Sequence, residues 1–118
     1  SDVVYSITVE NTGSGPVDAN SIVLIDALPN EISYFGGTTG ANSITFIDND
    51  SGLTFDPAVD VRFSKASTAP TTFLGCSDTA GAGYDDTINF ICLSPKGTMS
   101  EGTITPSSFT IEFRAVVK

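Results

Sequence analysis

Apolar and polar residues alternate with a period of two along most of this chain. The pattern is clearest at the two ends, where apolar residues occupy every second position over 3–9 and 109–117. Such alternation is typical of strands with one buried face and one face in water. Shorter apolar runs lie between them, over residues 22–28, 32–35, 43–47, 59–63 and 88–93. Nowhere do apolar residues recur at helical spacing for three turns, so we predict essentially no helix.

Turn-forming residues separate these runs. Gly, Pro, Asn, Asp and Ser cluster after each one, as in residues 11–16, 48–52, 77–86 and 94–106. About seven to nine short antiparallel strands in a chain of this length predict an all-β fold, an immunoglobulin-like β-sandwich. The Cys-Trp-Cys arrangement of antibody domains is absent. A chain of 118 residues supports one hydrophobic core, so we expect residues 1–118 to form a single module.

The first thirty residues carry a recognisable motif. Tyr5, Ile7 and Val9 lead into Asn11-Thr12-Gly13, and the next apolar run ends in Asp26-Ala27-Leu28-Pro29. This spacing resembles the signature of a bacterial repeat family catalogued as domain of unknown function eleven. The resemblance implies an immunoglobulin-like module, repeated in tandem on secreted or cell-surface proteins, that serves as a stalk or adhesin segment. Its partners would be neighbouring modules of the same chain and a surface ligand or protein.

The residues of this motif also have a physical interpretation. Asn11 and Gly13 tolerate the left-handed backbone conformation, so we expect the turn after the first strand to close without strain. Pro29 cannot donate a ladder hydrogen bond, so the second strand should end near Leu28. Asp26 has inward parity, and we expect its carboxylate to accept backbone hydrogen bonds near a strand end.

The charge balance restricts the partners. The chain has 14 acidic and 5 basic residues, for a net charge of −9. This field repels phosphate backbones and anionic headgroups, so we expect no nucleic-acid partner and no direct membrane insertion. No apolar run approaches the roughly 20 residues of a transmembrane helix. Ser1-Asp2 leads directly into a predicted strand, so we expect a module from a longer protein rather than a chain that opens with a signal peptide.

The two cysteines, Cys76 and Cys92, lie sixteen positions apart. In an acidic, Ser/Thr-rich β chain they predict a disulfide and an extracellular or cell-surface location. Two alternatives are a pair of buried free thiols and a fragment of a metal site. The metal alternative is the weaker one because the chain offers no other soft ligand for tetrahedral zinc.

The strongest candidate for a ligand site is the acidic segment Asp48-Asn49-Asp50-Ser51-Gly52. Alternating oxygen side chains followed by Gly can wrap around Ca²⁺, so Asp48, Asp50, Asp56 and Asp60 are candidate ligands. No helices flank the segment, and it is not an EF-hand. The alternative is an Asx-rich turn between two strands. Asp78, Asp85 and Asp86 form a second, weaker acidic loop, and we expect no other cofactor.

Enzymatic chemistry has little support in this sequence. Histidine is absent, which removes the commonest general base and any Ser-His-Asp triad. We therefore predict a non-catalytic extracellular module, with a calcium-dependent binding module as the alternative. A further hypothesis is that the last strand, residues 109–118, pairs with another chain by β-augmentation.

Overall fold

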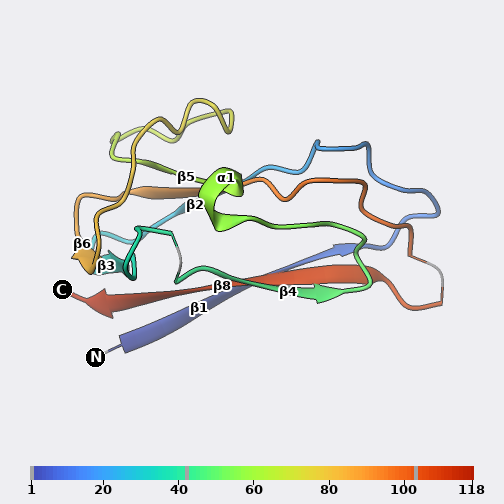
Figure 1. The fold of residues 1–118 in the computed structure, drawn as a ribbon, viewed down its shortest axis with the longest axis horizontal. Helices are drawn as coiled ribbons and strands as arrows, with labels where there is room; N and C mark the ends of the chain where they lie inside the picture. The colour runs from blue at the N-terminus through green and yellow to red at the C-terminus, as the bar shows by residue number, and fades with distance from the viewer. Residues whose placement is uncertain (1, 42, 103) are drawn as a thin grey trace.

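The computed structural model describes residues 2–41, 43–102 and 104–118, and it shows two antiparallel sheets packed face to face (Figure 1). The all-β sandwich predicted from the alternation is confirmed. In the described part of the chain the strands are β1 Asp2–Asn11, β2 Leu24–Ala27, β3 Ile32–Phe35, β4 Thr45–Asn49, β5 Val61–Ser64, β6 Tyr84–Asp85, β7 Phe90–Leu93 and β8 Ser107–Val117. The helix in these ranges is the single turn α1, Pro57–Asp60.

The last strand, β8, is the centre of the larger sheet, which has the order β1-β8-β3-β6. One edge of β8 pairs with β1 over ten positions, from Asp2↔Val116 to Asn11↔Ser107. Its other edge pairs with β4 and then with β3. Because β8 has neighbours on both sides, the hypothesis that this strand offers a free edge is wrong. The smaller sheet has the order β2-β7-β5.

The main core lies between the two sheets. Phe109, Ile111 and Phe113 of β8 are at most 1% exposed and face Ile91 and Leu93 of β7, which are fully buried. Aromatic rings pair along the larger sheet, in Tyr5–Phe113 and Phe46–Phe109, and between the two sheets, in Tyr34–Phe63. The period-two pattern of the last strand therefore marks the core face correctly.

A second, smaller core covers the outer face of the β2-β7-β5 sheet. Cys76 and Cys92 form the predicted disulfide, with their Cα atoms 6.5 Å apart. Both are fully buried and pack with Phe90, Ile25 and Phe73. The bridge ties the loop between β5 and β6 to the central strand of the sheet. This cover explains why β7 is apolar on both faces.

The structure corrects several of the predicted elements. The segment around residue 59 was predicted as strand, but Asp56 caps the helical turn α1 and its Oδ1 accepts the N–H of Ala58 at 3.0 Å. Strand β5 therefore begins only at Val61. Strand β4 extends to Asn49, so the first part of the predicted acidic loop is strand. Residues 84–85, predicted as loop, pair with β3 as β6.

The turn after β1 closes differently from the prediction. Neither Asn11 nor Gly13 has a positive φ, so the turn does not use the left-handed conformation that these residues tolerate. Instead, Asn11 Oδ1 accepts the N–H of Gly13 at 2.9 Å, and Asn11 Nδ2 donates to the carbonyls of Gly15 and Ser100. The side chain of Asn11 replaces the backbone as the organiser of this turn.

The Leu-Pro end of the second run behaves as predicted. Strand β2 ends at Ala27, and the N–H of Leu28 donates to Asn89 O at 2.9 Å. The Pro29 carbonyl then accepts the N–H of Ile32 at 3.1 Å, which turns the chain into β3. Since β1 and β2 lie in different sheets, the chain crosses the sandwich between them and forms no hairpin.

Candidate binding pocket and acidic side chains

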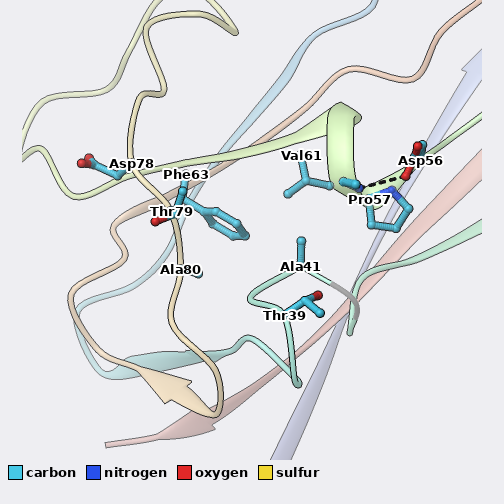
Figure 2. Close-up of a pocket in the computed structure, with 10 residues that line it drawn as sticks. Thr39, Ala41, Asp56, Pro57, Val61, Phe63, Asp78, Thr79 and Ala80 are labelled. Carbon is cyan, nitrogen blue, oxygen red and sulfur yellow. Dashed lines mark hydrogen bonds between the residues drawn. The ribbon is translucent and has the colours of Figure 1, made fainter.

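A pocket of about 450 Å³ opens between β5, α1 and two loops (Figure 2). Val61 and Phe63 of β5 form its inner wall, and Ala41, from the β3–β4 loop, faces them. Its lining is mainly apolar, with hydroxyl and carboxylate groups at the margin. In Figure 2 two carboxylates stand at opposite ends of this pocket. The remaining lining residues are Thr39, Asp56, Pro57, Ala58, Asp78, Thr79 and Ala80.

Glycines allow the two loops of the pocket to touch. A Cβ atom on Gly36 would lie 2.2 Å from the carbonyl oxygen of Gly81, and one on Gly40 would lie 2.2 Å from the carbonyl oxygen of Ala80. Gly40 also has a φ of +91°, which side-chain-bearing residues rarely adopt. The Gly36 N–H donates to Gly83 O at 2.7 Å. Direct backbone contact therefore replaces side-chain packing along this wall.

Tyr34 supports the floor of the pocket. Its hydroxyl donates to Gly40 O at 2.8 Å, and its ring packs 5.1 Å from that of Phe63. Burial raises the pKa of Tyr34 to about 12, against a smaller lowering by the hydrogen bond with Ser43. The hydroxyl therefore stays protonated and holds the β3–β4 loop in place as a donor.

The carboxylates at the margin are engaged in local structure. Asp56 caps α1, and Asp78 Oδ2 accepts the N–H of Lys65 at 2.8 Å. Since these two groups stand at opposite ends, they form no acid–base pair across the pocket. The pocket is suited to a ligand whose apolar part enters it and whose positive charge lies near the carboxylates at the margin. Sequence reasoning missed this pocket because three segments far apart in the sequence, 39–41, 56–63 and 78–80, contribute its lining.

The predicted calcium ligands occupy different local environments. Asp48, on β4, accepts the N–H of Ser51 at 3.0 Å and also the Ser51 hydroxyl. Asp50 is exposed and has a φ of +57°. Asp56 caps α1, as described above. These contacts match the alternative interpretation of the segment as an Asx-rich turn.

Asp60 is the buried member of the predicted set, with 2% of its surface exposed. Its Oδ2 accepts the N–H of Asp56 at 2.8 Å. Its Oδ1 lies 3.1 Å from Lys96 Nζ but makes no hydrogen bond within the described residues, so this contact is a charge pair without hydrogen-bond alignment. Lys96 Nζ donates instead to Ser94 O at 2.7 Å. The pair fastens α1 to the segment that follows β7.

No three acidic or cysteine side chains in residues 2–41, 43–102 and 104–118 gather in a way that could hold a metal ion. Asp48 and Asp50 lie at the end of β4, whereas Asp56 and Asp60 lie at the two ends of α1. Calcium binding by Asp48, Asp50, Asp56 and Asp60 stays a prediction, which calorimetric titration with Ca²⁺ tests directly.

Two other carboxylates show opposite electrostatic effects. Asp26 is half-buried on β2, and burial raises its pKa. The backbone hydrogen bonds expected for its carboxylate are not formed within the described ranges of the chain. For Asp85, burial raises the pKa, but hydrogen bonds from Gly81 and Thr87 outweigh it and the pKa is lowered overall. Asp85 therefore organises its loop, whereas Asp26 is an inward charge at a sheet edge.

No family model matches the chain, and searches of curated proteins and of solved structures find no significant match. The likeness to the bacterial repeat family therefore stays a prediction based on the residue motif. No helix in the described part of the chain has the length and hydropathy needed to cross a bilayer.

Proposed function

We propose that this chain is a non-catalytic recognition module of an extracellular or cell-surface protein, an adhesin segment rather than a load-bearing stalk. The disulfide is compatible with an oxidising compartment outside the cytosol. The apolar pocket gives the module a concave surface for a ligand. Its net charge of −9 favours cationic over anionic partners.

The observation that carries the choice of adhesin over stalk is the position of the chain ends. Asp2 pairs directly with Val116, so both ends of the fold lie together at one end of the molecule (Figure 1). Tension applied through the two ends would open the β1–β8 ladder one pair at a time, beginning at Asp2. A stalk module resists better when many pairs are loaded together. The disulfide shields residues 77–91 from extension but leaves this ladder unprotected.

Single-molecule force spectroscopy tests the proposal with two attachment geometries. In the first, handles at both chain ends pull the ladder open. In the second, handles at the exposed Ser14 and at the C-terminus load β8 in shear against its neighbours. We expect the first geometry to unfold at a several-fold lower force. Equal forces, or a higher force from the chain ends, would restore the stalk function.

A further inference from the structure

The edges of the two sheets differ in how they are protected. Isolated edges invite pairing with other chains, and natural sheets avoid this with short strands, covering segments or inward-pointing charges. Strand β2 has four residues and carries the inward Asp26. The outer edge of β5 is occupied by Asp78, whose N–H donates to Phe63 O at 3.0 Å. Strands β4 and β6 have five and two residues.

Strand β1 has none of these protections. It is ten residues long and contains no Pro and no Lys. Its inward side chains are Val3, Tyr5, Ile7 and Val9, all uncharged. In the part of the chain that the structure describes, β1 pairs with β8 alone, in an unbroken register. Figure 1 shows β1 crossing β8 in this view.

The register shows which backbone groups face the open side. In an antiparallel ladder, successive residues direct their N–H and C=O groups to opposite neighbours. The Lys118 N–H donates to Glu31 O at 2.7 Å, so the backbone groups of Lys118 point toward β3. Those of Val117, the residue before it, therefore point toward β1. Counting along the register, the odd-numbered residues of β1 bond to β8. The even-numbered ones point their backbone groups outward: Asp2, Val4, Ser6, Thr8 and Glu10.

Side-chain contacts agree with this phase. Residues opposite each other without mutual backbone bonds bring their side chains closest. The even-numbered pairs of β1 and β8 do so: Thr8 and Thr110 hydroxyls lie 2.9 Å apart, and the Ser6 hydroxyl donates to Glu112 at 3.1 Å. Within the described residues, five residues of β1 therefore present, in a row, backbone donors and acceptors without a backbone partner.

The chemistry of the edge specifies its partner. The inward side chains of β1 are only half-buried, so an added strand with apolar residues at alternate positions would pack beside Tyr5, Ile7 and Val9. The even-numbered residues of β1, whose backbone groups point to the open side, begin and end with an acidic residue, Asp2 and Glu10. Two copies of β1 aligned about Ser6 would place these like charges opposite each other, between chains of net charge −9. A second copy is therefore a poor fit.

We propose that the β1 edge captures an extended segment of another protein in which apolar and basic residues alternate, by adding it as a strand to the larger sheet. This inference names a partner for the recognition module proposed above, but it is argued from the edge of β1 and not from the pocket or the position of the chain ends. Failure of the force experiment would leave it intact, and failure of the binding experiment below would leave the stalk question open.

The test uses a labelled synthetic ten-residue peptide that alternates valine with lysine, and a control peptide of the same composition in which the residues are shuffled. Fluorescence anisotropy measures binding, and amide hydrogen exchange locates it. In the free protein, the amides of Val4, Ser6 and Thr8 should exchange much faster than those of Tyr5 and Ile7. The alternating peptide should slow exchange at the even-numbered residues selectively.

Two variants separate the edge from the rest of the surface. Ser6→Pro removes an outward N–H without taking a bond from β8, and we expect at least a tenfold loss of affinity. Ser6→Ala is the matched control because it keeps that N–H and loses only the hydroxyl contact with Glu112. Glu10→Lys should weaken binding several-fold more than Asp86→Lys, the same charge change at an exposed position that follows β6, at the other edge of the larger sheet.

Several results would overturn the proposal. They are no binding at millimolar peptide, equal binding of the shuffled peptide, unchanged binding by Ser6→Pro, or protection elsewhere than on β1. Sedimentation that shows a dimer dissolved by Ser6→Pro would assign the edge to a second copy instead. If Ser6→Pro does not fold, the unmodified protein decides the question. The alternating peptide must then slow amide exchange selectively at the even-numbered residues of its β1.

Discussion

Breaking the Cys76–Cys92 disulfide should lower stability by an amount that follows from its loop length. The bridge closes a loop across sixteen positions. In the chain-entropy treatment, a loop of this size restricts the unfolded chain enough to stabilise the fold by about 3 kcal/mol. Unfolding entropy of about 2.1 cal/mol/K per residue converts this, for a chain of 118 residues, into a fall in melting temperature of about 12 °C.

Circular dichroism melts of the oxidised protein and of the protein kept under reductant measure this difference. The double variant Cys76→Ala, Cys92→Ala should melt lower still, because it also removes both sulfur atoms from the cluster with Phe73 and Phe90. Reductant should not shift the melting temperature of the double variant, which controls for side effects. Oxidised and reduced proteins that melt within about 3 °C of each other would refute the loop-closure reasoning.

Three further changes test the site and its surroundings. Lys96→Met leaves the buried carboxylate of Asp60 without its charge partner and should lower the free energy of unfolding in urea by about 1–2 kcal/mol. The loss is no larger because Lys96 itself is partly exposed. Lys65→Met, at an exposed position, should change it by nothing measurable. Gly40→Ala should cost about 2 kcal/mol or more, whereas Gly15→Ala, which has open space around it, should be near neutral; equal melting temperatures would contradict the close loop approach. Since burial raises the pKa of Asp26, native stability should fall as pH rises from the ordinary aspartate range through that raised pKa. Asp26→Asn should therefore be more stable than the unmodified protein at pH 7 but not at low pH, as followed by melts across pH.

Sequence periodicity predicted the fold well where strands are long or lie between clear turn signals. Strand β3 has the predicted bounds, and the inward set of β8 is correct through Ala115. The pattern failed at Val117, the last residue of β8, which is half-exposed. The helical turn α1 had a readable signal in Asp56-Pro57, a capping residue followed by a proline at the first helical position.

The candidate site was much less predictable than the fold. Its pocket depends on two loops that meet through backbone atoms at Gly36 and Gly40, and no local pattern encodes such an approach. Asp60 was a candidate calcium ligand because it follows the acidic segment 48–52, but its charge partner in the fold is Lys96, thirty-six positions later in the chain. Contacts between segments far apart in the sequence determine both the pocket and the environment of Asp60. Such contacts leave no periodic pattern in the sequence.

The pairing of the first strand with the last also governs how the chain can acquire its structure. Asp2 pairs with Val116 and Asn11 pairs with Ser107, so β1 lacks its partner strand until residues 107–116 are present. The entropy cost of closing so long a loop precedes the favourable contacts of the β1–β8 ladder, and this makes folding slow. During synthesis or threaded export, β1 therefore stays without its partner strand until β8 has emerged.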